Sequence, residues 1–255
     1  MRSSGFHFML GAALTVLPTM LAAQRGPAPA STRLAPEILA LACAPTLVAA
    51  DPAMPLRVTG GQDSFTRRIF MPGDLITINA GRENGIEVGQ EFYVRRTQTQ
   101  TGASRISGET PGVIHTAGWI RIYAVDDRMS LATISHACDT IETNDYLEPF
   151  ALPTVPTLAT ERATPQRGNY GKVLPGGDRR TSFGRGDFII VDRGSNHGVT
   201  PGAQFVIYRD RKQAENFLFD LGEAVAVDVK PETATLFVTV SRDALTAGDY
   251  VALRK

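Results

Sequence analysis

The sequence predicts a mainly β protein made of two tandem repeats, each a small barrel or sandwich, preceded by a short helix. Residues 73–96, GDLITINAGRENGIEVGQEFYVRR, return as residues 186–209, GDFIIVDRGSNHGVTPGAQFVIYR. Short β-branched runs such as LITIN and FIIVD alternate with turn residues, which is typical of all-β chains. Because a fixed internal repeat marks one folded unit used twice, we expect the same fold in both copies.

The repeat extends beyond these segments when the spacing is allowed to change. A shift of 113 residues aligns the two segments, and downstream the offset falls to 104, where Gly118 meets Gly222. The residues lost lie between Arg96 and Gly118, in a polar stretch that predicts an exposed hairpin loop. The expected organisation is a signal peptide (1–23), an N-terminal segment (24–55), repeat 1 (56–150), a Pro/Thr-rich linker (151–170) and repeat 2 (171–255).

The repeated glycines predict matching tight turns. In NAGRENG and DRGSNHG, glycine and the preceding Asn84 or His197 tolerate positive φ. Asp74 and Asp187 are expected to bond amides of their own turns. The turn-forming positions are Gly73, Asp74, Gly81, Gly85, Gly89, Gly186, Asp187, Gly194, Gly198 and Gly202.

The first residues predict export by a cleaved signal. Arg2 precedes an apolar run from Phe8 to Leu21, and small residues follow, with cleavage expected near Ala23. A glycine and a proline interrupt the run, which is shorter than the about 20 apolar residues that span a bilayer. No later segment suits a transmembrane span, so we expect a periplasmic or extracellular protein.

The two cysteines, Cys43 and Cys138, predict a disulfide, because exported proteins fold in oxidising compartments. A short helix is expected after Pro36, ending near Pro45, with Cys43 on its last turn. The alternative is a lipid anchor at Cys43. It is disfavoured because Ala40 stands three residues before the cysteine, where a lipoprotein signal has a large aliphatic residue.

The protein offers few residues suited to catalysis or to nucleic acid. Its 26 basic and 26 acidic residues cancel, so no net positive field favours a polyanion. His115, His136 and His197 lack metal-ligand spacing, and no CxxC, GxSxG or phosphate-loop pattern occurs. Asp126 and Asp127 have no carboxylate counterparts in repeat 2 and suit a strand turn. We expect a protein that is not an enzyme and uses no cofactor or metal. A hydrolase with an unrecognised site is the least favoured alternative.

Two groups of residues are candidates for binding. Trp119 and Tyr123, four apart on an expected strand, share a face and could stack on sugar together with the loop 97–116; core or barrel-rim roles are the alternative. Arginines at strand ends could hold an anionic polymer or a carboxylate-bearing surface, and the alternative is a solvated rim with local acidic partners. The arginine candidates are Arg67, Arg68, Arg95, Arg96, Arg209 and Arg211, with Arg179, Arg180 and Lys212 nearby.

The pattern GDxIxI, G, NG, G, FxVxR, followed by a hairpin and a closing GDY, resembles a repeated β domain of bacterial envelope proteins. Examples are the C-terminal domain of flagellar assembly protein T and modules that accompany peptidoglycan-binding LysM domains. The resemblance covers residues 56–150 and 172–255; repeat 1 departs at Asn144, where repeat 2 has Gly248, and no LysM segment is recognisable. It implies a scaffold or adaptor and transfers no catalytic residue.

The leading hypothesis is therefore a non-enzymatic envelope adaptor that binds protein partners through barrel rims or exposed strand edges. The alternative is a module that binds peptidoglycan or another glycan.

Overall fold

A computed structural model describes residues 34–48, 55–63, 66–99, 112–157, 164–166, 168–176, 180–210 and 217–254. Contacts divide the protein into residues 1–33 and a compact unit, Leu34–Lys255. The predicted signal peptide and three of the basic residues singled out above, Arg179, Arg211 and Lys212, lie outside the described residues. Among the helices that are described, none has the length and apolar character to cross a bilayer.

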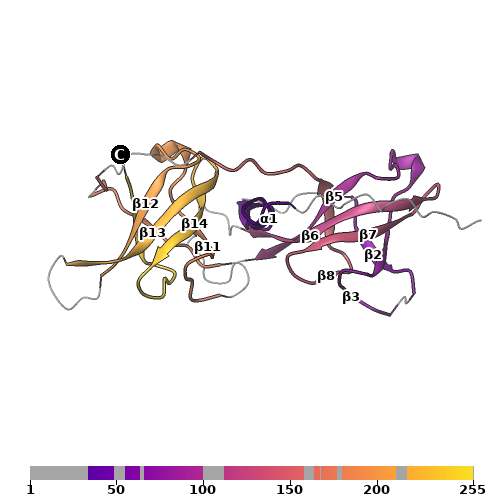
Figure 1. Cartoon of the computed structure of the whole chain (residues 1–255), viewed down its shortest axis with the longest axis horizontal. Helices are drawn as coiled ribbons and strands as arrows, with labels where there is room; N and C mark the ends of the chain where they lie inside the picture. Colours follow the sequence, from indigo (N-terminus) through magenta and orange to yellow (C-terminus); the bar gives the residue numbers. More distant parts are fainter. Residues whose placement is uncertain are drawn as a thin grey trace, which may run out of the picture. The chain divides into compact units, whose positions relative to one another are not determined.

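The protein folds as a mainly β structure, which confirms the predicted fold class (Figure 1). The first curled sheet has the order β2-β4-β7-β6-β5-β9, with β1 added to β6. Its two end strands meet, because an isolated bridge joins Arg57 to Tyr146 and the Val58 N–H donates to the Asp145 carbonyl at 2.9 Å. The strands are β1 (Thr46–Val48), β2 (Val58–Gly61), β4 (Leu75–Ile78), β5 (Glu91–Thr99), β6 (Gly112–Val125), β7 (Ser130–Ala137) and β9 (Tyr146–Pro149).

The second curled sheet has the order β10-β15-β12-β13-β14-β11, and a bridge between Val173 and Val191 joins its ends. A separate pair, β3 (Ile69–Phe70) and β8 (Ile141–Glu142), lies beside the first sheet. Its counterpart in the second is the single bridge between Phe183 and Leu245. The remaining strands are β10 (Gly171–Lys172), β11 (Phe188–Val191), β12 (Gln204–Asp210), β13 (Leu218–Val229), β14 (Ala234–Ser241) and β15 (Tyr250–Leu253).

The two sheets are copies of one topology. Going around each closed sheet, the strands β2, β4, β7, β6, β5 and β9 of the first follow the same cyclic order as β10, β11, β14, β13, β12 and β15 of the second. The ladders open at different points, because β2 pairs with β4 whereas β10 pairs with β15. Even a register shift recurs: it falls between Val94 and Arg95 in β5, and between Ile207 and Tyr208 in β12. Because a bridge joins the end strands of each sheet, part of each of these two edges is paired within the protein.

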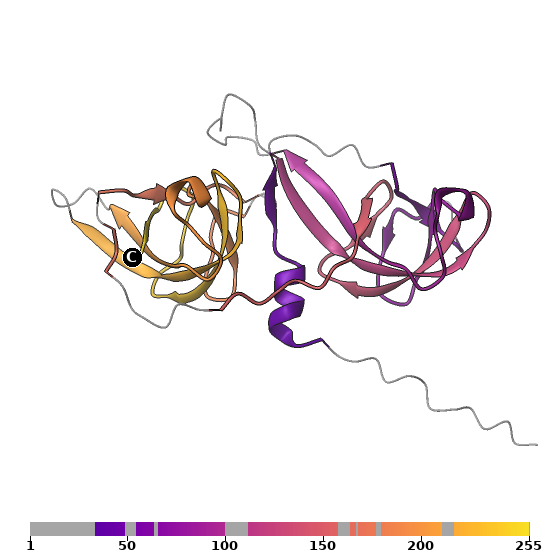
Figure 2. The ribbon, with the colours of Figure 1, turned by 90° about the horizontal axis from the view of Figure 1, so that it is seen from above.

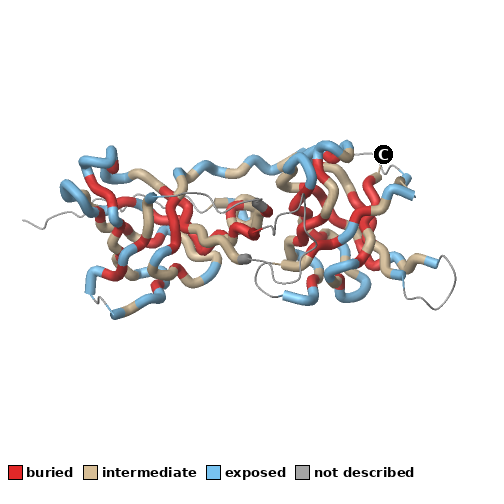
Figure 3. Tube along the Cα trace, turned by 180° about the vertical axis from the view of Figure 1, so that it is seen from behind, coloured by how far each residue is buried: buried red, intermediate tan, exposed pale blue. Residues whose placement is uncertain are grey.

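Each curled sheet encloses its own apolar core, seen as buried tube inside both halves of Figure 3. Phe70, Ile76 and Ile120 are fully buried in the first core, and Phe205 and Leu236 in the second. Removing this apolar surface from water is the main stabilising term, at about 25 cal/mol per Å². Two separate cores explain why the alternating strand pattern appears twice in the sequence.

The N-terminal segment links the two sheets. Helix α1 (Pro36–Ala42) begins at a proline, as expected, and Cys43 caps its end. After it, β1 pairs with the start of β6, visible beside the helix in Figure 2. Leu47 of β1 packs with one residue of the first repeat and two of the second, and the Thr235 hydroxyl donates to the Pro45 carbonyl at 2.8 Å. This cluster, here called the junction, consists of Leu47, Val113, Leu174 and Ile190.

The turn predictions are confirmed for most of the repeated glycines but wrong for Asn84 and His197. Positive φ falls on Gly73, Gly85 and Gly89 and on their three counterparts. Asn84 and His197 instead end short 3-10 helices, η1 (Arg82–Asn84) and η2 (Ser195–His197). Their side chains accept the Gly81 N–H at 3.2 Å and the Gly194 N–H at 3.3 Å, so they are capping residues.

The expected loop at 97–116 is shorter than predicted. Strand β5 continues to Thr99 and β6 begins at Gly112, so both ends of the stretch belong to a long hairpin. Residues 100–111 lie outside the described residues. The alternation of Thr and Gln at 97–100 suits a solvated strand as well as a loop, which is why polarity misplaced the boundary.

Candidate functional site

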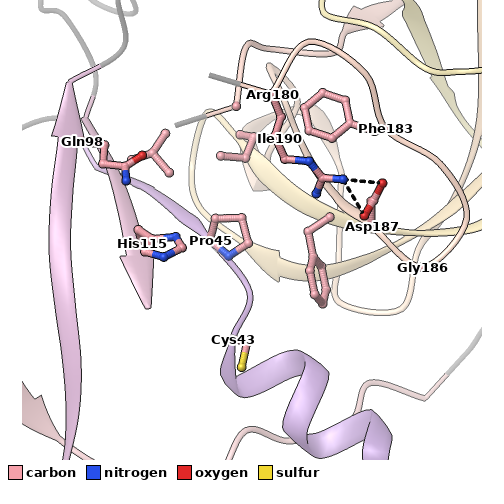
Figure 4. Close-up of a pocket in the computed structure, with 12 residues that line it drawn as sticks. Cys43, Pro45, Gln98, His115, Arg180, Phe183, Gly186, Asp187 and Ile190 are labelled. Carbon is pink, nitrogen blue, oxygen red and sulfur yellow. Dashed lines mark hydrogen bonds and ion pairs between the residues drawn. The ribbon is translucent and has the colours of Figure 1, made fainter. Parts of the chain in front are cut away.

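A cavity of about 180 Å³ lies where the long hairpin, the end of α1 and the second sheet meet (Figure 4). Gln98 and His115 line it from β5 and β6, and Cys43 and Pro45 line it from the N-terminal segment. The second sheet and the loop before it supply an apolar wall and one ion pair. Those residues include Phe183, Phe188, Ile190, Arg180 and Asp187.

The polar groups around this cavity are mostly paired with one another. Arg180 donates to both carboxylate oxygens of Asp187, at 3.0 Å each, as the dashed lines in Figure 4 show. His115 Nε2 lies 3.1 Å from Asp139 Oδ2. Although burial opposes it, bonding from the Thr140 N–H and from His115 holds the pKa of Asp139 below its usual value. By contrast, the buried Oε1 of Gln98 has no hydrogen-bond partner.

This arrangement suits binding better than bond-breaking chemistry. Covalent catalysis needs a free nucleophile beside a base. The sulfur that lines the cavity, Cys43, is bonded to Cys138, so it offers no thiolate. The paired arginine and the apolar wall together provide a surface for a small, partly apolar group.

The disulfide between Cys43 and Cys138 confirms the sequence prediction, with the two Cα atoms 5.7 Å apart. It ties α1 to the end of β7, across a sequence separation of 95 residues. The His136 ring lies close enough to both sulfurs to complete a three-ligand metal set. Metal binding needs thiolates, so the oxidised bond prevents the two sulfurs from serving as ligands.

Trp119 is covered by the N-terminal segment. Its side chain is 5% exposed and packs with Ala42 of α1, while its ring stacks on His136 at 4.4 Å and on Phe150 at 5.2 Å. Tyr123, farther along β6, is 62% exposed. Trp119 therefore offers no stacking face to a sugar while α1 is in place, and the proposed glycan platform of Trp119 with Tyr123 is not assembled.

Most of the described arginine candidates pair with acidic neighbours of their own repeat. Arg67 pairs with Asp74, and Arg180 pairs with Asp187 at the same relative position. Amide bonding from Met71 and then Arg67 lower the pKa of Asp74. The Asp74 and Asp187 carboxylates accept the Met71 and Gly184 amides at 2.8 Å, which confirms the turn contact predicted for both aspartates.

Three further arginines also pair with acidic side chains, whereas a fourth is exposed. Arg95 pairs with Glu148 at 2.6 Å, and Arg96 pairs with Glu142 and Asp145. Arg209 makes two bonds to Asp249, which raise its pKa above the usual value. Arg68 is exposed on the approach to β3.

Sequence reasoning missed the most informative pair of positions. Val113 of β6 and Phe217, just before β13, correspond at the offset of 104. Val113 is 1% exposed and belongs to the junction, whereas Phe217 is 57% exposed. The alignment at that offset contained the signal, but only the structure shows that one position is covered and the other is not.

Asp126 and Asp127 lie in the turn between β6 and β7, as predicted, where the Asp127 N–H donates to Asp126 Oδ1 at 2.8 Å.

Comparison of the sequence with protein-family models finds no match, and comparison with curated proteins finds no significant relative.

Proposed function

We propose that this protein is an exported, non-enzymatic adaptor of the cell envelope that binds a partner protein through the β12–β13 hairpin. The predicted signal peptide and the resemblance to envelope β domains support the location. The disulfide fits an oxidising compartment outside the cytoplasm. The observation that carries the proposal is the contrast between Val113 and Phe217.

The equivalent hairpin of the first sheet already performs such a contact within the protein. Val113 shares a buried cluster with Leu174 and Ile190 of the second repeat, and Leu47 completes it. The contact works because a small apolar side chain at the hairpin end fills a space on the outer face of a curled sheet. Burial of this kind is the usual source of affinity between protein surfaces.

The second hairpin carries a larger apolar group at the same place. The Phe217 ring contacts Phe219 edge-on, with centroids 4.9 Å apart, and most of Phe217 faces solvent. Aromatic side chains are frequent anchors of protein interfaces because they bury much area with little loss of rotamer entropy. The partner expected here is a protein that presents an apolar pocket on a sheet face, similar to that formed by Leu174 and Ile190.

Backbone pairing is a weaker mechanism for this protein. Partner strands add to a sheet only where unpaired N–H and C=O groups line an edge. Bridges between the end strands satisfy part of both edges, at Arg57 with Tyr146 and at Val173 with Val191. Side-chain contact at the hairpin end is therefore the proposed mode.

The test is photocrosslinking in living cells of the source organism. A photoreactive residue replaces Phe217 in one strain and Tyr123 in a control strain, since both side chains are well exposed but lie on different sheets. We expect a discrete protein adduct from position 217 and none from position 123. In a separate affinity purification without the photoreactive residue, the same partner should co-purify with the wild type and be lost with the Phe217→Ser variant. Equal adducts from both positions, or unchanged co-purification with Phe217→Ser, would contradict the proposal.

A further inference from the structure

A second cavity, of about 270 Å³, lies on the outer surface of β5 and β6. The polar groups that line it, and the part of the second sheet that it touches, differ from those of the cavity in Figure 4. The end of α1 and the start of β1 form one wall, and the end of β13 forms another. The lining residues used below are Arg95, Thr116, Ile114, Val227, Asp228 and Lys230.

Two neighbouring side chains of this cavity carry buried polar atoms without partners. Arg95 and Thr116 lie opposite each other in the β5–β6 register. The Arg95 Nε and the Thr116 Oγ1 are both buried and make no hydrogen bond, and Thr116 is 1% exposed. Buried donors without acceptors destabilise a fold, so two of them side by side indicate a place where an acceptor binds.

The Arg95 guanidinium is held in place. Its Nη1 donates to Glu148 at 2.6 Å, and its carbon lies 4.3 Å from the centre of the Tyr93 ring. Because these two contacts fix the plane of the group, the free Nε–H has a fixed direction. The hydroxyl of Thr116 can rotate to donate alongside it.

We propose that this cavity binds a small aliphatic carboxylate, with one oxygen accepting from Arg95 Nε and the other from the Thr116 hydroxyl. A carboxylate presents two acceptors at the spacing that adjacent donors require. Ile114 and Val227 provide apolar surface for a short hydrocarbon tail, and at the far wall Lys230 is paired with Asp228, with 3.6 Å between Nζ and Oδ1. Because Glu148 and Asp228 already balance the charges of Arg95 and Lys230, their repulsion costs a monoanion less than a dianion such as phosphate.

The pair of donors at Arg95 and Thr116 has no equivalent at the corresponding positions of the second repeat. Tyr208 and Asp220 occupy the register positions that correspond to Arg95 and Thr116, and the Asp220 carboxylate is bonded to Arg242 at 2.7 Å. A carboxylate there would meet a like charge instead of two donors. The proposal is independent of the adaptor function, because it uses neither Phe217 nor the ring that Phe217 contacts.

The experiment uses the oxidised protein, labelled with ¹⁵N, and follows the Arg95 Nε–H signal during titration. Butyrate is the probe for a free carboxylate, and a short peptide ending in valine is the probe for the carboxyl terminus of a polypeptide. Butyramide, the C-terminally amidated peptide and sodium chloride are the controls. We expect the chemical shift of this signal to change saturably with butyrate. The acid probe that binds with the higher affinity then identifies whether a free carboxylate or a polypeptide carboxyl terminus fits the site better.

Thr116→Val supplies a second readout. Valine keeps the shape of threonine and removes the hydroxyl, so the melting temperature of the ligand-free protein should rise by a few degrees. The affinity for butyrate should fall about tenfold, as expected for one lost bond to a charged group. The matched control is Thr77→Val, whose hydroxyl bonds to the Gly60 carbonyl on another strand pair.

The expected pattern is thus a more stable Thr116→Val protein that binds butyrate weakly, with Thr77→Val binding normally. An Arg95 signal that responds equally to chloride and butyramide would overturn the proposal. Equal butyrate affinity in Thr116→Val would overturn it too, as would a lower melting temperature of that variant.

Discussion

Arg96 holds Asp145 inside the first curled sheet: its Nη2 donates to Asp145 Oδ2 at 3.1 Å, and the Asp145 side chain is 4% exposed. The Glu142 N–H donates to the same oxygen at 2.8 Å. Arg209 and Asp249 repeat the pair in the second sheet, with bonds of 2.8 and 2.7 Å. The aspartate of the closing NDY or GDY turn therefore forms a largely buried ion pair with an arginine in both repeats.

The Asp145 pair predicts a pH-dependent stability. Burial is the main cause that raises the pKa of Asp145 to about 6, against the bonds from Glu142 and Arg96. In the unfolded state the pKa is about 3.9, so the fold favours the protonated carboxyl. This contribution is fully present below about pH 4 and is lost as the pH rises to about 6.

Urea unfolding at several pH values checks this prediction. The free energy of unfolding of the wild type, relative to Asp145→Asn, should fall by up to about 3 kcal/mol between pH 4 and pH 6 and then level off. A carbon-detected titration of the Asp145 carboxyl supplies the direct value. A midpoint at or below pH 4 would show that the ion pair outweighs burial.

Reduction of the disulfide should release α1 and expose Trp119. The bond closes a loop of 95 residues, so its loss should cost about 4 kcal/mol of unfolding free energy. Trp119 is the one tryptophan of the sequence, and α1 covers it, so its fluorescence should shift to longer wavelength. The double variant Cys43→Ser, Cys138→Ser should show the shifted spectrum without reductant; a shift absent after reduction verified by mass would contradict the prediction.

Gly81→Ala should destabilise the protein more than Gly73→Ala. A Cβ on Gly81 would overlap the Asp126 carbonyl oxygen, which is backbone and cannot move aside. We expect a cost of about 3 kcal/mol from such overpacking. Gly73 has φ +102° but open space around it, so alanine there should cost about 1 kcal/mol.

Gly194→Ala offers an internal repeat of the Gly81 measurement. A Cβ there would overlap the Lys230 carbonyl oxygen in the same way. Urea unfolding of the three variants gives the comparison. Similar losses for Gly73→Ala and Gly81→Ala would mean that the close approach is relieved by backbone movement.

His197→Asn should preserve stability, whereas His197→Ala should lower it by about 1 kcal/mol. Asn84 already caps η1 in the first repeat, and its amide oxygen takes the place of the His197 ring nitrogen. Thermal melts at one pH compare the two variants. Equal melting temperatures for the asparagine and alanine variants would show that the cap contributes nothing.

The sequence by itself determined the fold class, the repeat and the disulfide of Cys43 with Cys138. These depend on local rules: alternating strands, glycines where φ is positive, and a cysteine pair in a protein with a predicted export signal. The same rules placed the turn contact of Asp74 and the helix that ends at Cys43. Each of these signals lies within a few residues or within a fixed repeat spacing.

Only the tertiary structure decided which side chains are available. Trp119 became a core residue because α1 folds over an outer sheet face, and Arg95 gained a partner from β9 while its Nε stayed free. Val113 and Phe217 occupy equivalent positions in the two repeats, yet Val113 is buried in the junction and Phe217 is exposed. Burial depends on contacts between segments far apart in the sequence, and periodicity within one strand carries no information about them.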